Sequence, residues 1–249
     1  MSKNKITIDE NKLKILKVKD DTDKLTVDHT VFSLPIRGLL IARSGQGKNS
    51  QLLNIMCSDL FKYNKLFKGK DIYIFAPDPY GDEKMRKLID YYQIEDNNIY
   101  SGDKPDLEGL EHVYKGLIEE FRDDPTQKPV IIIDDYSSTG IFAKQYNILT
   151  KIFCNSRKYQ INIFFLQQAY VHTNPAIRSN ANVLILGNCS NKNLKLVAEE
   201  HNYLKDDKTF KNLFREHTKE QHHFFIVNYT NSYDRLYLDK DYKAILNIE

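Results

Sequence analysis

Short apolar runs alternate along the chain with longer segments in which apolar residues recur at helical spacing. The runs are rich in β-branched and aromatic residues and hold few polar positions, as expected for strands that are buried on both faces of a sheet. This pattern predicts strands at residues 36–42, 72–76, 130–133, 161–166 and 183–186.

The segments between these runs predict helices at residues 49–63, 82–92, 107–122, 142–158 and 191–201. Alternating strands and helices specify an α/β fold with a mainly parallel sheet, because each helix serves as a right-handed crossover between two strands. Two later apolar runs, 224–227 and 235–238, predict a hairpin near the C-terminus because turn-forming residues separate them.

The first 33 residues differ from the rest, since they mix short apolar and charged stretches. They predict two or three short edge strands or an extended arm. We find no internal repeat, no low-complexity segment and no linker, so the prediction is one domain over residues 1–249. It consists of an extension at 1–33, a core at 34–190 and a C-terminal helix and hairpin at 191–249.

The first predicted strand leads directly into a glycine-containing loop and a helix. Gly47 and Lys48 stand at the spacing of the phosphate-loop consensus, which is Gly, four residues, Gly-Lys and then Ser or Thr. The loop N–H groups, the helix dipole and the lysine all attract phosphate, whereas an incidental Gly-rich turn would not need this context. The predicted nucleotide-binding residues are Ser44, Gly45, Gln46, Gly47, Lys48, Asn49 and Ser50.

This loop departs from the consensus at two positions. Ala42 replaces the first glycine, which is tolerable unless that position needs a positive φ. Asn49 replaces the hydroxyl that binds Mg²⁺, and its amide oxygen is a weaker ligand. Ser50 points to a different face of the helix and is no direct substitute.

Two carboxylates, Asp134 and Asp135, end the third predicted strand. In a phosphate-loop fold the first acid at this place holds Mg²⁺, so we predict a metal site at Asp134 and Asn49. The second acid is placed to orient or deprotonate the attacking water. The alternative is a solvated acidic turn, which the upstream lysine loop disfavours.

Other polar residues follow the next strand. Gln167 and Gln168 end it, and an amide there can sense the γ-phosphate or polarise the water, although a simple polar cap is the alternative. Arg157 and Arg178 are candidates for an arginine finger supplied by a neighbouring subunit, with an ordinary surface arginine as the alternative for each.

Composition excludes some classes of protein but does not identify a function. Lys plus Arg is 36 and Asp plus Glu is 34, and the net charge of +2 excludes a histone-like basic coat while leaving room for a local basic surface. Cys57, Cys154 and Cys189 lack metal-ligand spacing and predict reduced, buried thiols. No apolar run is long enough to span a membrane and no secretory signal begins the chain, so we expect an intracellular protein.

Together these motifs resemble the FtsK/HerA superfamily of P-loop ATPases, and most closely the poxvirus-type genome-packaging ATPases of large DNA viruses and virophages. The resemblance covers roughly residues 34–190 and rests on the motif order. Its parts are the lysine loop at 39–48, the acid pair at 132–135, the glutamines at 165–168, and the stretches 155–159 and 177–180.

The resemblance implies a RecA/FtsK-like fold with ATP and Mg²⁺ as cofactors. It implies that Lys48 binds phosphate, Asp134 helps to hold Mg²⁺, Asp135 is the catalytic acid and Gln167 or Gln168 is the sensor. Arg157 corresponds to the region of the inter-subunit arginine. It also implies a homo-oligomeric ring, a hexamer or pentamer, around double-stranded DNA, with capsid or portal-vertex proteins as partners.

Two functions of different classes follow. The first is an active motor that packages DNA, located in the virion or in the viral factory of the host cytoplasm. The second is a hydrolytically impaired nucleotide-binding module of a DNA complex, which Asn49 favours. A related DNA helicase or transfer ATPase is a third alternative. The histidines at 217, 222 and 223 complete no metal-ligand set and are predicted to be surface residues.

Overall fold

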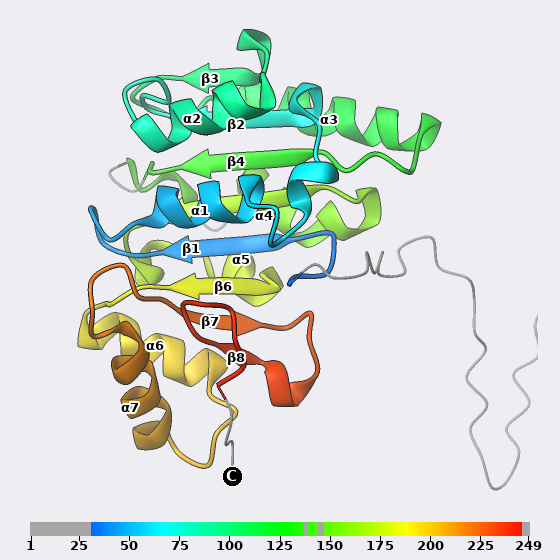
Figure 1. The fold of residues 1–249 in the computed structure, drawn as a ribbon. Helices are drawn as coiled ribbons and strands as arrows, with labels where there is room; N and C mark the ends of the chain where they lie inside the picture. The colour runs from blue at the N-terminus through cyan, green and yellow to red at the C-terminus, as the bar shows by residue number, and fades with distance from the viewer. Residues whose placement is uncertain (1–30, 137–138, 144–146, 246–249) are drawn as a thin grey trace, which may run out of the picture.

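The fold is described by a computed structural model that covers residues 31–136, 139–143 and 147–245. The predictions for residues 1–30 lie outside these described residues. Within them, every strand belongs to one continuous eight-stranded sheet (Figure 1). The α/β fold predicted from the alternating pattern is confirmed.

The strands follow the order β3-β2-β4-β5-β1-β6-β7-β8 across the sheet. The pairings from β3 to β6 are parallel, and β7 and β8 pair antiparallel at the end. The bounds are β1 Arg37–Ile41, β2 Ile72–Ala76, β3 Ile99–Ser101, β4 Val130–Asp134, β5 Asn162–Gln167, β6 Val183–Leu186, β7 Phe225–Asn228 and β8 Tyr237–Leu238.

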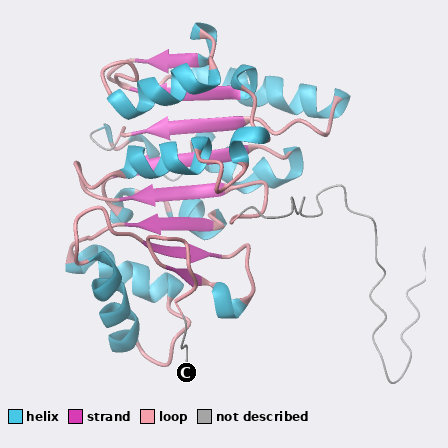
Figure 2. Ribbon diagram, viewed as in Figure 1, coloured by secondary structure: helices cyan, strands magenta, loops and turns pink. Residues whose placement is uncertain are grey.

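Helices cover both faces of the sheet, as Figure 2 shows. The apolar sides of α1 (Lys48–Cys57) and α2 (Glu83–Tyr92) join one core cluster. The second cluster lies on the opposite face. It takes apolar residues from α3 Leu107–Asp123, α4 Ile148–Asn155, α5 Pro175–Asn180, α6 Asn191–His201 and α7 Asp207–Thr218.

The continuous apolar runs explain this three-layer arrangement. Successive side chains of a strand point to opposite faces, so Ile131 and Ile133 of β4 enter one cluster while Val130 and Ile132 enter the other. All four are fully buried. A strand with apolar residues at every position therefore requires helices on both sides of the sheet.

Two predicted helices are longer than the real ones. The helix predicted at 49–63 ends at Cys57, because Ser58 is extended and its hydroxyl accepts a hydrogen bond from the Leu60 amide. The helix predicted at 142–158 is interrupted, since Asn147 caps a new helix by accepting from the Thr150 amide. In both places a short polar side chain competes with the helical backbone.

Three elements were missed by the sequence analysis, and two of them, β3 and α5, are short. β3 is an edge strand of 3 residues, too short to show a periodic pattern. α5 begins with an Asn174 cap and a proline in its first turn, and α7 begins with an Asp206 cap. These caps were available signals, and in α7 Phe210 and Phe214 also stand at helical spacing. The predicted C-terminal hairpin is confirmed as β7 and β8.

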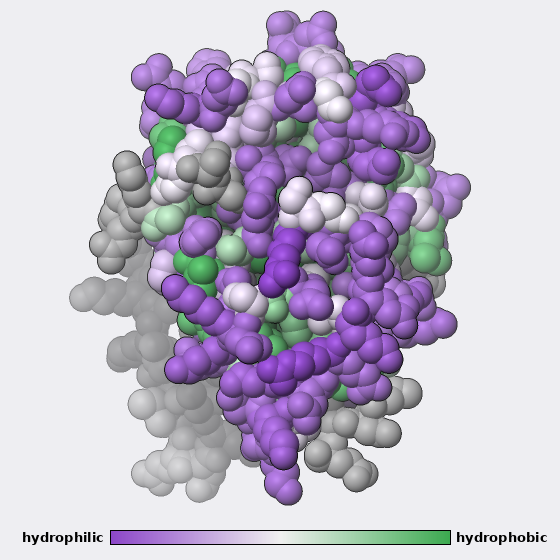
Figure 3. All heavy atoms as spheres, turned by 90° about the vertical axis from the view of Figure 1, so that its left-hand side faces the viewer, coloured by the Kyte–Doolittle hydropathy of each residue, from purple (hydrophilic) through white to green (hydrophobic). Residues whose placement is uncertain are grey.

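The parallel strands end at one edge of the sheet, which we call the carboxyl edge, and begin at the opposite amino edge. Figure 3 views the carboxyl edge and shows a predominantly hydrophilic surface. In the described part of the chain, no helix combines the length and the apolar character needed to cross a bilayer. The three cysteines are free thiols, but Cys154 is exposed on α4 and Cys57 and Cys189 are only partly buried, so the prediction of buried thiols is wrong.

Candidate nucleotide site

A pocket of about 560 Å³ opens at the carboxyl edge, and we call it the carboxyl-edge pocket. The loops that follow β1, β2 and β4 line it, together with one residue from the segment before β7. Ligands of open parallel sheets bind outside the carboxyl ends of the strands, where these loops converge. The predicted lysine loop and acid pair, which are far apart in sequence, therefore meet in one pocket.

The loop after β1 has the backbone that phosphate binding requires. Gly45 and Gly47 have φ of 74° and 92°, a region that favours glycine. Gly47 is followed at once by α1, whose N-terminus has no side-chain cap. The unpaired first amides of that helix therefore remain available to an anion in the pocket.

Ala42 fits at the first consensus position for two reasons. It is absent from the described residues that have positive φ, so its Cβ brings no backbone strain. Space for its methyl group comes from Gly187 after β6, where an added Cβ would lie only 2.7 Å from the Ala42 Cβ. The expectation that alanine is tolerated here agrees with this geometry.

Lys48 points back across the loop and is only 7% exposed. Its Nζ donates hydrogen bonds to the carbonyl oxygens of Ala42 at 2.9 Å and Arg43 at 3.5 Å. Burial lowers the pKa of this lysine, while the nearby Asp135 and Asp134 raise it. A phosphate would supply the negative charge that two carbonyl oxygens supply only in part.

Asn49 occupies the position of the consensus hydroxyl, and its amide bridges two acids. Its Nδ2 donates to Asp134 Oδ2 at 2.9 Å and to Asp82 Oδ2 at 3.0 Å. Asp82 precedes α2, and its other oxygen accepts from the amides of Lys84 and Met85. One amide group thus connects α1, α2 and β4 at the floor of the pocket.

Asp134 carries the features of a cation ligand. It is 7% exposed, and its Oδ1 is a buried atom without a hydrogen-bond partner among the described residues. Burial raises the pKa of this carboxyl to about 6, although the Asn49 hydrogen bond opposes the shift. An orphaned carboxylate oxygen fits a hard cation such as Mg²⁺, which prefers oxygen ligands.

The described residues contain no group of three or more His, Cys, Asp or Glu side chains able to hold a metal ion. A cation bound at Asp134 can therefore have at most one further carboxylate from these residues, and must take its remaining oxygens from a nucleotide, from water or from an amide. Mg²⁺ sites in nucleotide-binding proteins have this composition, with one or two carboxylates and several phosphate or water oxygens.

Asp135 and Gln168 form a direct pair at the same edge. The Gln168 Nε2 donates to both carboxylate oxygens of Asp135, at 2.7 and 3.0 Å. Asp135 has φ of 43°, an uncommon conformation for a residue other than glycine. The structure thus joins the predicted acid to the second of the two predicted glutamines, whereas Gln167 is buried at the end of β5.

Several residues of this pocket were not predicted, among them Asp82 and His222. Asp82 follows β2, and only its role as a helix cap was visible in the sequence. His222 was interpreted as a surface residue; it is exposed, yet it also lines the pocket, and a Cβ on Gly47 would lie 2.9 Å from its Nδ1. Ser50 lines this pocket as predicted, while Gln46 lines a neighbouring hollow of about 420 Å³.

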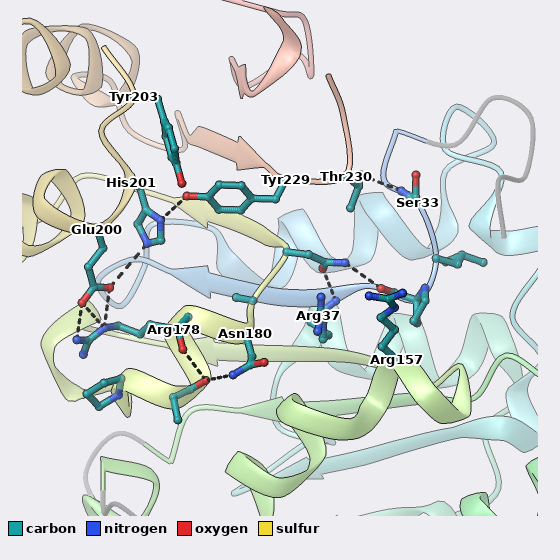
Figure 4. A pocket seen from close by; sticks show the side chains of 17 residues that line it. Ser33, Arg37, Arg157, Arg178, Asn180, Glu200, His201, Tyr203, Tyr229 and Thr230 are labelled. Atoms are coloured by element: carbon teal, nitrogen blue, oxygen red, sulfur yellow. Dashed lines mark hydrogen bonds and ion pairs between the residues drawn. The ribbon is translucent and has the colours of Figure 1, made fainter. Parts of the chain in front are cut away.

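Both predicted arginines lie elsewhere. Arg157 and Arg178 line a larger pocket of about 870 Å³, the amino-edge pocket, among residues that precede β1 and β6 or follow β7 (Figure 4). None of the described residues that line the carboxyl-edge pocket is an arginine. Neither Arg157 nor Arg178 therefore lines the carboxyl-edge pocket of its own chain.

The two arginines differ in what they contact. Arg178 is 7% exposed, and its guanidinium donates to both oxygens of Glu200 and to the Thr173 carbonyl. It also lies 5.1 Å from the centre of the Tyr170 ring. These contacts give Arg178 a structural role in its own chain, which counts against its prediction as an arginine finger.

Arg157 is exposed at the other end of the amino-edge pocket, beside Arg37 (Figure 4). Burial and the charge of Arg157 both lower the pKa of Arg37. The Arg37 Nε is buried and has no hydrogen-bond partner among the described residues. Two guanidinium groups side by side make this end of the pocket electropositive.

Comparisons with known proteins identify a family and a shared fold. The family model described as poxvirus A32 protein matches residues 25–247. No curated protein matched the chain in a sequence search.

Solved structures share the fold. The genome packaging NTPase B204 from Sulfolobus turreted icosahedral virus 2, in complex with ATP-gammaS, has a TM-score of 0.51 at 13% identity, covering 77% of this chain and 91% of that chain. B204, described as the DNA-packaging ATPase from Sulfolobus turreted icosahedral virus, has a TM-score of 0.53 at 15% identity, covering 78% and 94%. At such identity the likeness concerns the fold alone.

Proposed function

The chain belongs to the poxvirus A32 protein family, and from this premise we propose that it is an ATP-driven motor that packages double-stranded DNA into a viral capsid. The observation that carries the proposal is the convergence of Lys48, Asp134 and Asp135 at one pocket, with Gln168 hydrogen-bonded to Asp135 beside it. A mere nucleotide-binding module has no chemical need for a paired acid and amide there.

In this proposal the lysine loop binds the phosphates of ATP. The α1 N-terminus and the loop amides hold the phosphate oxygens, and Lys48 exchanges its two carbonyl acceptors for the β and γ oxygens. Asp134 and Asn49 would hold Mg²⁺, which neutralises the charge on the phosphates.

Asp135 orients and deprotonates the attacking water. Its two oxygens are held by one Gln168 amide group, so the carboxylate has a defined direction before substrate arrives. The same amide can sense the γ-phosphate, because a phosphate oxygen can compete with Asp135 for its N–H groups. A shift of the Gln168 amide from Asp135 to the γ-phosphate would link hydrolysis to the loop that follows β5.

Arg157 completes the site from a neighbouring subunit. The carboxyl-edge pocket is lined by no arginine of its own chain, and Arg157 is exposed at the opposite edge. A head-to-tail ring, a hexamer or pentamer, would bring the two edges together. The proposed partners are duplex DNA and capsid or portal-vertex proteins, and the proposed location is the virion or the viral factory.

One observation favours a second candidate, a hydrolytically impaired nucleotide-binding protein. The Asn49 amide donates to Asp134 where a hydroxyl would instead contribute an oxygen to Mg²⁺. If this arrangement persists with nucleotide bound, hydrolysis is slow although ATP still binds.

The test is steady-state ATP hydrolysis with Mg²⁺, with and without duplex DNA. We expect DNA-stimulated turnover, and we expect Asp135→Asn to lower kcat by about 100- to 10,000-fold because the general base is lost. Asp103→Asn is the matched control, since that acid is exposed and does not line the pocket.

Asn49→Thr separates the two candidates. Turnover in the unmodified chain supports the motor. A chain that binds ATP without turnover, and gains turnover in Asn49→Thr, supports the impaired protein. Absence of nucleotide binding by both forms would contradict both candidates.

A further inference from the structure

The amide of Asn49 lies between two carboxylates from different elements. Its Nδ2 is 2.9 Å from Asp134 Oδ2 and 3.0 Å from Asp82 Oδ2. Both acids line the carboxyl-edge pocket. Three side chains from α1, β4 and the start of α2 therefore converge on one point.

The chemistry of the acids determines which end of the amide faces them. An ionised carboxylate only accepts hydrogen bonds, so the NH₂ group faces the acids and the amide oxygen turns away. The NH₂ group carries the partial positive charge of the amide. It satisfies, with two N–H bonds, the same carboxylate oxygens that a divalent cation would bind.

Asp82 is held in position by its own helix. Its Oδ1 accepts from the amides of Lys84 and Met85 at 2.8 Å each, which fixes the carboxylate plane and directs Oδ2 toward Asn49. A second oxygen is available across the convergence point, because Asp134 Oδ1 is buried and has no partner among the described residues. Such an oxygen is costly unless a cation or donor reaches it.

We propose that Asp82 is the additional cation ligand that compensates for the missing hydroxyl at position 49. Asp82, Asp134 and Asn49 form an all-oxygen site for a divalent cation once the Asn49 side chain turns its carbonyl oxygen inward. The inference rests on the proposed function in that the cation is the one that accompanies ATP.

Cation binding competes with the hydrogen bonds that Asn49 makes to the two carboxylates. The cation and the NH₂ group of Asn49 bind the same two carboxylate oxygens, so the cation must displace two hydrogen bonds to charged groups before it binds. Displacement replaces the direct hydrogen bond between α1 and the start of α2 with a connection through the cation. Because two ligands are carboxylates of the protein, the cation binds the chain even before the nucleotide does.

The experiment measures Mn²⁺ binding to the full nucleotide-free chain by electron paramagnetic resonance. Asp82→Asn is expected to weaken Mn²⁺ affinity by about 10-fold or more, in the range seen when a supporting carboxylate of a metal site is lost. Asparagine still caps a helix, so α2 is preserved. Asp78→Asn is the matched control, since Asp78 lines the same pocket but contacts Gly81 rather than Asn49.

A double-mutant cycle tests the competition. Asn49→Thr removes the bridging amide and restores a hydroxyl, so the loss caused by Asp82→Asn should shrink to about 2- or 3-fold in that background. An equal loss in both backgrounds would overturn the coupling between Asn49 and Asp82. Equal Mn²⁺ affinity for Asp82→Asn and the unmodified chain would overturn the role of Asp82.

ATP binding by the unmodified chain, measured in the presence of Mg²⁺, keeps the two proposals apart. A chain that binds ATP but whose Mn²⁺ affinity is insensitive to Asp82 contradicts only the cation site. A chain that binds no ATP contradicts the proposed function itself, and with it the inference. Thermal unfolding of each variant confirms that the compared proteins are folded.

Discussion

The two edges of the sheet carry opposite kinds of charge. Acids outnumber lysines around the carboxyl-edge pocket, whereas three arginines and one glutamate line the amino-edge pocket. The two pockets hold the charges in different ways. At the carboxyl edge one oxygen of Asp134 has no hydrogen-bond partner among the described residues, while at the amino edge Arg178 and Glu200 satisfy each other. A charged group is available for function only where its own chain leaves it incompletely paired.

Arg157 and Arg178 differ in exposure, since Arg157 is exposed and Arg178 is buried, and the largest expected effect tests Arg157. Arg157→Ala should lower ATP turnover about 1000-fold or more, the magnitude of an arginine finger, with little change in thermal stability because the side chain is exposed. ATP affinity should stay unchanged, since Arg157 does not line the carboxyl-edge pocket. Turnover and nucleotide binding are measured at protein concentrations at which the chain associates.

Lys158→Ala is the control, because Lys158 is the adjacent exposed cation. A comparable loss of turnover in that variant would show that general surface charge matters rather than one arginine. Full turnover in Arg157→Ala would remove Arg157 from the proposed site.

The next effect concerns Arg178 and is structural. Glu200→Gln leaves the buried guanidinium without its carboxylate and should lower the free energy of unfolding by about 3–5 kcal/mol, toward the lower end because the Glu200 side chain is 30% exposed. The double variant Arg178→Met with Glu200→Gln should recover part of that loss. Urea unfolding measures both, and a Glu200→Gln protein of unchanged stability would contradict the structural role.

The smallest expected effect is on the pH dependence of folding stability, to which His201 at the amino edge and Asp134 at the carboxyl edge contribute with opposite signs. Burial lowers the pKa of His201 from 6.5 to about 4, although Glu200 raises it, so the ring stays neutral between Tyr170 and Tyr229. The unfolded chain binds the proton more readily, and His201 therefore adds stability that rises with pH from about 4 to 6.5 by up to about 3 kcal/mol.

Asp134 acts in the opposite direction over the same range. Its pKa is raised from 3.8 to about 6, so the folded chain holds the proton longer and stability falls as pH rises from about 4 to 6. The two slopes largely cancel in the unmodified chain. His201→Gln should show stability that falls with pH, and Asp134→Asn should show stability that rises, in urea unfolding at pH 4.5, 5.5 and 6.5; parallel curves would contradict both assignments.

The sequence predicted the carboxyl edge far better than the amino edge. The lysine loop, the acid pair and the glutamines each end an apolar run, and in a parallel sheet such ends meet at one edge. Asp82 also follows a strand, but a helix cap looks the same whether or not its second oxygen faces a ligand. No local signal showed that it would contact Asn49, 33 positions away.

At the amino edge the sequence left Arg157 and Arg178 equivalent. Their difference depends on Glu200, which lies on α6 and reaches Arg178 only because α5 and α6 pack on the same face of the sheet. The position of His222 beside Gly47 also depends on the tertiary structure, because the segment before β7 returns to the phosphate loop only after the sheet has formed.

By itself, the sequence determined the sheet, its parallel core and the chemistry at the ends of its strands. Strand burial and turn formation depend on residues that are close together in the sequence. Only the tertiary structure decided which charges neutralise one another. Pairing depends on distances between residues that the chain brings together after its crossovers, and periodicity contains no information about those distances. The availability of Asp134 and the engagement of Arg178 are therefore properties of the fold.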